Sequence, residues 1–331
     1  MKRYTIVDIP KPERIGRLVD HLYAKMPEIE SARAVLLTES YRQTEGEPMI
    51  LRRAKAFEHI LKNIPIIIRE EELIVGSSTI APRGCQTYPE FSFEWLEAEF
   101  DTVATRSADP FYISEQTKKD LREVHKYWKG RTTSELATSY MTPETLRSIE
   151  HNMFTPGNYF YNGVGHVTVQ YDKVLRIGLE GIREEARELL SGLSMADGDY
   201  QKRSTFLQAV IISCDAVILY ARRYMVLAKQ MADACTDGTR KKELLQIAMN
   251  CGRVPAKGAE SFYEACQSFW FIQQLLQLES SGHSISPGRF DQYMYPYYRK
   301  DLEEGRLTRE FAQELMDCIW VKLNDLNKCR D

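Results

Sequence analysis

The sequence lacks long apolar runs, a glycine-rich nucleotide motif and an excess of either charge. No run approaches the ~18 uninterrupted apolar residues that a membrane-spanning helix requires, and the N-terminus has no apolar signal core. The 44 basic and 47 acidic residues are spread along the whole length, which gives neither a basic stripe for nucleic acid nor a cationic face for a membrane. We therefore expect no export, no membrane insertion and no nucleic-acid partner, and we expect a small neutral molecule as the ligand.

Closely spaced cysteines, of the kind that bind metal, are also missing. The seven cysteines are an odd number and include no C-x-x-C pair, which argues against a disulfide framework and a zinc ribbon. Cys214 and Cys266 fall within apolar helical patterns, where a thiol behaves as a small hydrophobe and not as a nucleophile. This cysteine usage fits a reducing cytosol best.

Helical periodicity dominates the chain, so we expect an α-rich fold. Apolar spacing predicts a helix that opens near Pro12, followed by helices over 31–42, 48–63, 115–128, 172–190, 202–235, 260–280 and 308–326. Short buried strands are predicted at 66–68 and 73–75, and residues 166–171 alternate like a strand. Segment 194–199 reads as a loop within one domain, because the helices on both sides are apolar enough to pack together.

The helix over 260–280 is apolar on nearly all sides, which predicts a central position. Gly282 can end this helix in a left-handed cap, and the chain then delivers His283 and Ser284 from a rigid element into a cavity. The alternative is a simple cap and turn, in which Ser284 or Ser286 bonds to free backbone groups. The residues by themselves leave both interpretations open.

Charged and aromatic residues near this loop are expected to play structural parts. Arg289 and Asp291 favour an ion pair that holds the shape of the loop over a catalytic role. The tyrosine-rich stretch 293–298 is expected to pack under the loop. Three carboxylates on or near apolar helices favour pairing with arginine over acid catalysis; they are Asp215, Glu264 and Glu279.

His166 follows two glycines, at 163 and 165, and precedes a β-branched run. A single histidine on a strand is usually a packed or solvent-facing residue. The glycines favour a functional role, because glycine lets the backbone approach a ligand closely and histidine titrates near neutral pH, where a leaving hydroxyl must be protonated. We expect no metal site from His166, His283 and a carboxylate, since histidines this far apart carry almost no metal-specific information.

Five blocks of the chain resemble the N-terminal part of the glycyl radical enzymes, in the pyruvate formate lyase-like superfamily. The resemblance covers essentially the whole chain, through residues 33–40, 72–77, 88–91, 158–166 and 282–289. The turn over 287–291 resembles a pattern found broadly in the superfamily. The pairs Gly165-His166 and His283-Ser284 resemble, in particular, the branch of cobalamin-independent propane-1,2-diol and glycerol dehydratases.

The resemblance implies a ten-stranded α/β barrel surrounded by helices in the complete protein. This chain would supply the outer helices and the first part of the barrel wall, as one incomplete domain over 1–331. The sequence stops directly after an amphipathic pattern, with no glycine or proline to end the helix, so we expect it to be truncated.

The resemblance also implies the chemistry. In this family a radical on a backbone glycine, installed by a radical S-adenosylmethionine activase, passes to a cysteine that removes hydrogen from the substrate. No block here resembles that glycine or cysteine, so the chain binds no cofactor of its own and is expected to be inactive alone. By the resemblance, His166 matches the histidine that hydrogen-bonds the departing hydroxyl, and His283 with Ser284 matches the groups that hold the substrate hydroxyls, with Arg289 and Asp291 supporting the loop.

The expected function is thus that of the N-terminal part of a lyase that converts propane-1,2-diol, or glycerol, to an aldehyde and water. The alternatives are another glycyl radical lyase or dehydratase of the superfamily, or a non-catalytic helical remnant. The expected partners are a small diol, the activase and, in the full-length protein, further copies of itself. The expected location is the cytoplasm, with a bacterial microcompartment as a further option.

Overall fold

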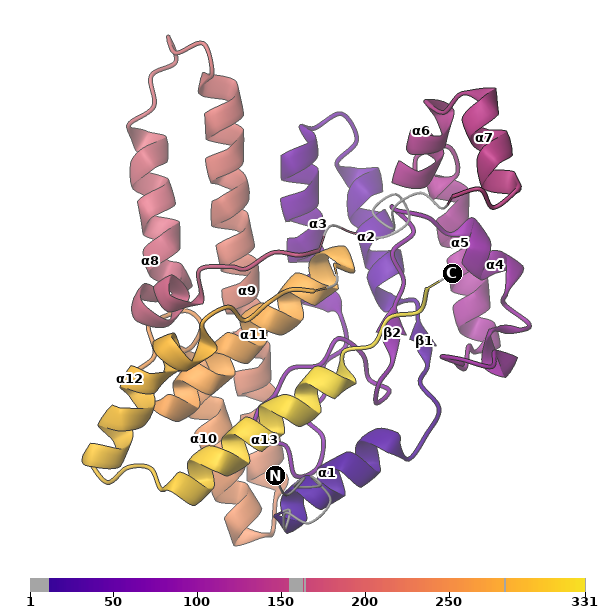
Figure 1. Cartoon of the computed structure of the whole chain (residues 1–331). Coiled ribbons are helices and arrows are strands. Elements are labelled where there is room, and N and C mark those ends of the chain that lie inside the picture. Colours follow the sequence, from indigo (N-terminus) through magenta and orange to yellow (C-terminus); the bar gives the residue numbers. More distant parts are fainter. Residues whose placement is uncertain (1–11, 155–162, 164, 283, 331) are drawn as a thin grey trace, which may run out of the picture.

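The computed structural model describes residues 12–154, 163, 165–282 and 284–330. Most of these residues are helical, as the sequence predicts (Figure 1). The longer helices are α1 (Glu13–Tyr23), α2 (Ala32–Gln43), α3 (Met49–Asn63), α5 (Glu115–Trp128), α8 (Tyr171–Ser191), α9 (Tyr200–Ala234), α10 (Gly238–Arg253), α11 (Phe262–Ser280), α12 (Phe290–Glu303) and α13 (Arg309–Asp325). Three shorter helices are α4 (Glu94–Ala98), α6 (Thr133–Ser139) and α7 (Pro143–Glu150). The sequence prediction missed α4, α6, α7, α10 and α12.

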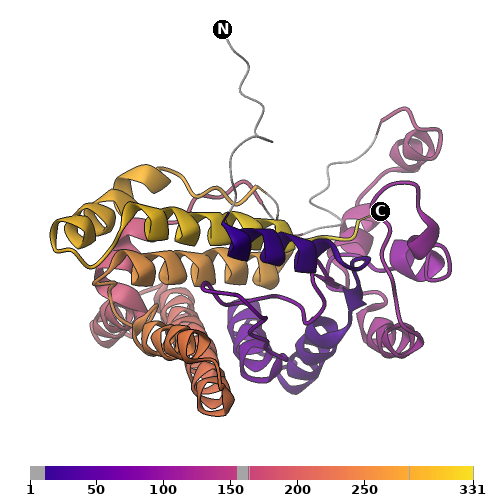
Figure 2. The same ribbon diagram turned by 90° about the horizontal axis from the view of Figure 1, so that it is seen from below.

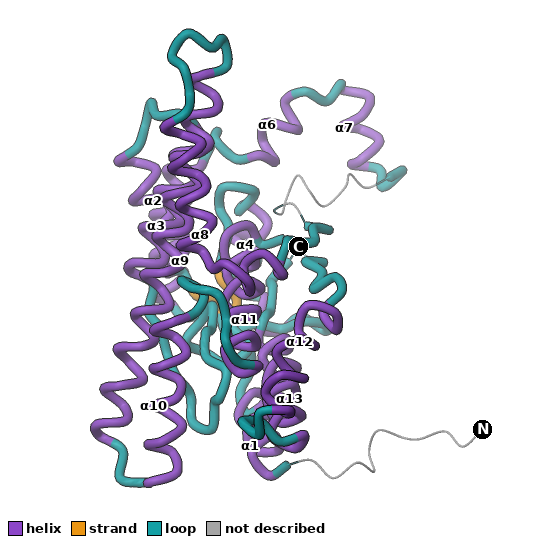
Figure 3. Tube along the Cα trace, turned by 90° about the vertical axis from the view of Figure 1, so that its left-hand side faces the viewer, coloured by secondary structure: helices purple, strands orange, loops and turns teal. Residues whose placement is uncertain are grey.

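Helix α11 is central, as its apolar sequence predicts. One of its faces, with Phe271 and Leu275, joins a buried cluster formed with α2, α3, α9 and α10. Its other face, with Phe269 and Trp270, joins a second cluster formed with α1, α12 and α13. Figures 2 and 3 show the resulting layers, with α11 between the long helices on one side and α1 and α13 on the other.

The predicted strands at 66–68 and 73–75 are wrong, because both stretches are irregular in the structure. Ile68 and residues 73–75 are buried and Ile66 and Ile67 are half-buried, but at 73–75 polar side chains of α11 take the place of a strand ladder. Gln267 accepts from the Val75 amide at 2.9 Å and donates to its carbonyl at 2.8 Å, and Tyr263 donates to the Leu73 carbonyl at 2.7 Å. A buried backbone needs hydrogen-bond partners but does not need another strand to supply them.

The described residues hold two short strands, β1 (Ile29–Glu30) and β2 (Cys85–Gln86), which pair in parallel with Ile29 opposite Cys85. Helices α8 and α9 flank the predicted loop at 194–199 and lie side by side, joined by an ion pair between Arg183 and Asp215. Among the described residues, α9 is also the one helix long and apolar enough to cross a membrane. Half of its most apolar 18-residue window is buried, as expected of a core helix.

Four buried charged side chains join the irregular segment 69–83 to the end of α13. Arg69 donates to Asp325 at 2.7 Å, and Lys322 donates to Glu72 at 2.5 Å. Both cations also donate to the Ser77 hydroxyl, at 3.0 and 2.9 Å. Two positive and two negative groups thus neutralise one another, which is the condition under which charge can be buried at all.

Candidate functional site

The two segments singled out in the sequence lie side by side. Thr168 and Ser286 form a parallel β-bridge, in which the Ser286 amide donates to the Val167 carbonyl at 3.0 Å. Gly288 follows with φ of +67°, and a Cβ there would lie 2.8 Å from the Thr168 methyl carbon. The short alternation at 166–171 therefore forms one bridge in place of the predicted strand, and that bridge joins the two candidate segments.

His166 and Ser284 occupy equivalent places in the two segments. Each lies two residues before its segment's bridging residue, each is exposed, and each has φ of 58°. A positive φ in a residue other than glycine is uncommon and strained, and such residues gather at functional sites. Of the three predicted site residues, the structure places His166 and Ser284. The third, His283, lies outside the described residues.

The end of α11 corrects the predicted cap. The left-handed residue is Ser281, with φ of 51°, and its amide donates to the Gln277 carbonyl at 3.2 Å. Gly282 instead donates its amide to the Ser280 hydroxyl at 3.2 Å. Gly163 packs against this turn so closely that a Cβ on it would overlap the Ser280 carbonyl oxygen. The backbone at residue 163 lies so close to the backbone of Ser280 that no side chain would fit, which explains why the residue is a glycine.

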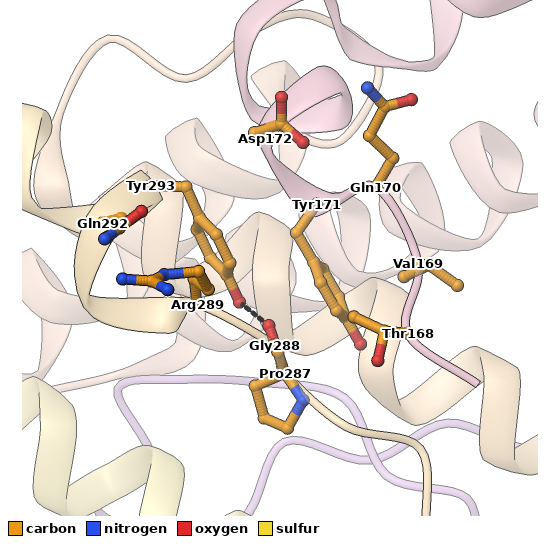
Figure 4. Close-up of a pocket in the computed structure, with 10 residues that line it drawn as sticks. All are labelled: Thr168, Val169, Gln170, Tyr171, Asp172, Pro287, Gly288, Arg289, Gln292 and Tyr293. Atoms are coloured by element: carbon orange, nitrogen blue, oxygen red, sulfur yellow. Dashed lines mark hydrogen bonds between the residues drawn. The ribbon is translucent and has the colours of Figure 1, made fainter. Parts of the chain in front are cut away.

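Buried side chains fix the position of the second segment. Gln273 of α11 donates to the Ile285 carbonyl at 2.9 Å and accepts a hydrogen bond from the Tyr171 hydroxyl. Tyr293 donates to the Pro287 carbonyl at 2.7 Å, as expected for a tyrosine packed under the loop (Figure 4). Burial raises the pKa of both tyrosines, so their hydroxyls remain protonated donors at neutral pH.

A cavity of about 600 Å³ opens beside the bridged segments. The Tyr171 and Tyr293 rings stack with centroids 5.7 Å apart along it, and Arg289 and Asp172 contribute its charged groups (Figure 4). Arg289 and Asp291 form no ion pair with each other in the described chain, although both lie at the start of α12, where Arg289 is the N-cap residue and makes no side-chain cap bond. The expected ion pair is thus not what shapes this loop; the Tyr293 and Gln273 bonds are.

The predicted pairing of three carboxylates with arginine is confirmed, although none of the three is fully buried. Asp215 pairs with Arg183, Glu264 with Arg253 and Glu279 with Arg53. The two helical cysteines are buried, and burial raises the pKa of the Cys214 thiol to about 11 and that of Cys266 further. These thiols stay protonated and unreactive. Within the described ranges, no group of three or more metal-binding side chains comes together.

Comparison with known proteins relates this geometry to a family. The family model described as pyruvate formate lyase-like matches residues 9–331. Two solved structures superpose over nearly the whole chain. The structure from Roseburia inulinivorans that describes 1,2-propanediol dehydration is 70% identical, with a TM-score of 0.96 over 99% of this chain and 39% of that one. The glycerol-bound B12-independent glycerol dehydratase from Clostridium butyricum is 55% identical, with a TM-score of 0.94 over 98% of this chain and 41% of that one.

The curated relatives include enzymes that act on other substrates. The isethionate sulfite-lyase of Oleidesulfovibrio alaskensis is 38% identical over 93% of this chain and 38% of its own length. The chain thus spans about 40% of the length of the proteins it matches. The helix-rich fold agrees with these structures, and the sequence resemblance to the diol dehydratase branch is confirmed. The chain belongs to the pyruvate formate lyase-like family.

Proposed function

We propose that this chain is the N-terminal part of a glycyl radical dehydratase that converts propane-1,2-diol, or glycerol, to the aldehyde and water. One observation carries the proposal: the two segments that resemble the diol dehydratase branch, far apart in sequence, meet at the Thr168 and Ser286 bridge. The similarity to the two dehydratase structures supports the same reaction class.

His166 would act on the departing hydroxyl. Loss of a hydroxide from a diol is slow unless the leaving oxygen is protonated, and histidine can donate that proton near neutral pH. The reaction is redox-neutral: one hydrogen leaves C1 and one is returned to C2, the hydroxyl at C2 leaves with one added proton as water, and the hydroxyl at C1 gives up its proton as it becomes the aldehyde carbonyl. His166 is exposed in this chain.

Ser284, with His283, would hold the substrate hydroxyls. A serine hydroxyl both donates and accepts, which suits an alcohol ligand. The strained backbone of Ser284, held between the α11 cap and the bridge at Ser286, fixes where its side chain begins. Arg289 and Asp291 would shape the start of α12 below this loop.

The hydrogen abstraction would be supplied by a glycyl radical of the full-length protein, installed by a radical S-adenosylmethionine activase. No block of the 331 residues resembles the radical glycine or its partner cysteine, so we propose that this chain alone does not turn over substrate. We also propose that residues 1–331 form one incomplete domain that contributes to a larger barrel, and that the full-length protein assembles into a homo-oligomer. Its proposed location is the cytoplasm, with or without a microcompartment.

The test is anaerobic activation of the uninterrupted gene product with its activase, followed by a coupled aldehyde assay on propane-1,2-diol and on glycerol. Aldehyde that forms only after activation is the expected result, with propane-1,2-diol the faster substrate. A glycyl radical signal without aldehyde from either diol would refute the proposed substrate class and point to another reaction of the superfamily. Absence of the radical would favour the non-catalytic alternative.

A further inference from the structure

The last turn of α11 ends in carbonyl groups whose partners must come from outside the helix; the Gln277 carbonyl accepts from the amide of Ser281, the residue that caps the helix. These carbonyls carry the negative end of the helix dipole, and the segment with Ser284 begins directly after them. Tyr88 donates to the Gln277 carbonyl at 2.8 Å. Arg33 donates to the Leu278 carbonyl at 2.7 Å and to the Glu279 carbonyl at 2.7 Å.

Arg33 is 1% exposed and uses its whole guanidinium. Nε donates to Leu278 O, while Nη1 donates to Thr87 O and Glu90 Oε2, both at 3.2 Å. Nη2 donates to Glu90 Oε1 at 2.6 Å and to Glu279 O at 2.7 Å. An arginine has five N–H donors, so each of them is engaged here. A lysine has the charge but offers three donors from a single point and cannot reproduce the planar fork.

The charges around this arginine are balanced. Glu90, 5% exposed, compensates Arg33, and Arg53 pairs with the Glu279 side chain while donating to the Glu279 carbonyl at 3.2 Å. The Arg33 guanidinium also lies over the Tyr88 ring, 3.9 Å from its centroid. Burying this assembly costs desolvation energy, and an apolar contact would hold two helices together at a lower cost. What the assembly adds is a fixed position for the end of α11.

Resting on the function proposed above, we propose that Arg33 is a positioning residue for the diol site: it fixes the last turn of α11 and, through Ser281, the place of Ser284. Arg33 holds the carbonyls of residues 278 and 279, the left-handed Ser281 turns the chain out of the helix, and Ser284 follows before the bridge at Ser286. Lys328 also contacts this turn, by donating to the Gly282 carbonyl.

The chain offers a matched control. Arg223 of α9 donates to the Leu61 carbonyl at 2.7 Å and to the Ile64 carbonyl at 2.6 Å, so it caps the end of α3 as Arg33 caps the end of α11. Neither of these bonds reaches the candidate segments. A conservative change there tests for the general cost of disturbing a helix end.

The first arm measures hydrogen exchange in the 331-residue chain, where no activity is needed. Arg33→Lys is expected to speed exchange of the hydrogen-bonded amides within 281–288, those of Ser281, Gly282, Ser286 and Gly288, by at least ~10-fold, since the local structure that protects them opens more often. Arg223→Lys should leave the exchange rates of these amides unchanged and speed exchange only at the end of α3. Equal exchange at 281–288 in the Arg33→Lys variant and the wild type would overturn the proposal, and so would an equal effect of both variants.

The second arm uses the activated full-length protein. Arg33→Lys is expected to raise the KM for the diol by roughly 10-fold while the glycyl radical content stays at the wild-type level, because a displaced Ser284 weakens substrate binding. A drop in radical content with unchanged KM would show a purely structural role. If the wild type forms the radical but no aldehyde, the proposed diol reaction fails, whereas the exchange arm still decides the part played by Arg33.

A milder variant keeps the test decisive if Arg33→Lys does not fold. Tyr88→Phe removes only the hydroxyl that donates to Gln277 and keeps the ring beneath Arg33. It should speed exchange at 281–288 by about 3-fold, in line with the loss of one hydrogen bond. No change in this variant would contradict the proposal.

Discussion

The buried charges that join segment 69–83 to α13 make a stability prediction on the chain itself. Asp325→Ala removes the carboxylate that accepts from Arg69 at 2.7 Å and from the Arg83 amide at 2.8 Å. Arg69 and Asp325 are 7% and 6% exposed, so little water can replace the lost partner. Removing one member of a buried pair costs roughly 3–5 kcal/mol. We expect a loss of about 4 kcal/mol in the free energy of unfolding.

Urea denaturation of the 331-residue chain at neutral pH measures this loss, with the midpoint and slope fitted together. Asp197→Ala is the control, because Asp197 lies 4.0 Å from Arg203 on the surface, where such a pair contributes at most about 1 kcal/mol. The double variant Arg69→Met/Asp325→Leu should recover much of the loss, since it leaves no lone charge. A cost below about 1 kcal/mol for Asp325→Ala would refute the reasoning.

The Asp325 carboxylate also predicts the direction in which the stability of the chain changes with pH. Burial alone would raise the pKa of Asp325, but Lys322 and Arg69 outweigh burial and leave it below its ordinary value of 3.8. A lowered carboxyl pKa contributes stability that is present above the unfolded pKa and is lost as the pH falls through the folded value. The wild type should therefore lose stability below about pH 4 more steeply than Asp325→Ala, and parallel acid titrations of the two proteins would contradict this.

The remaining predictions concern the candidate site. In the full-length protein, His166→Ala should leave the glycyl radical formed, as seen by its electron paramagnetic resonance signal, but slow dehydration by at least ~100-fold, the usual cost of losing a positioned proton donor; normal turnover would exclude that role. Ser284→Ala should raise the KM for the diol more than it lowers kcat, and an unchanged substrate dependence would favour the capping-turn interpretation. Gly163→Ala should destabilise the 331-residue chain by about 2 kcal/mol or more, because the added Cβ overlaps Ser280 O; an unchanged thermal midpoint would show that the turn can move.

The sequence predicted most of the helices that bury an apolar stripe, and α10, which buries Leu244, Ile247 and Cys251, is the exception. Helix α8 was expected over 172–190 and spans Tyr171–Ser191, whereas α7 buries no residue and α12 carries Pro296 within it. The spacing of apolar residues reveals a helix only where one face of it is buried, so a surface helix shows little apolar periodicity. The strands at 66–68 and 73–75 were wrong for a related reason: apolar runs show that a segment is buried but not what pairs with its backbone.

The site was predictable in its parts but not in its assembly. The unusual settings of His166 and Ser284 could be seen in the sequence, but their meeting depends on a bridge between Thr168 and Ser286 that no local pattern encodes. Gln273 gave a signal that went unused, since a glutamine inside a wholly apolar helix is buried and must find a partner. Arg33 gave none, because its contacts come from two segments far from it in the sequence, residues 86–90 and the end of α11.

The measurement that tests the account most directly is a crystal structure of the full-length protein with propane-1,2-diol bound. The account predicts the diol beside the bridged segments, with one hydroxyl within about 3 Å of the His166 ring and the other within the same distance of the Ser284 hydroxyl. A diol bound away from both residues, in a protein that forms aldehyde, would contradict the central claim that these two segments build the substrate site.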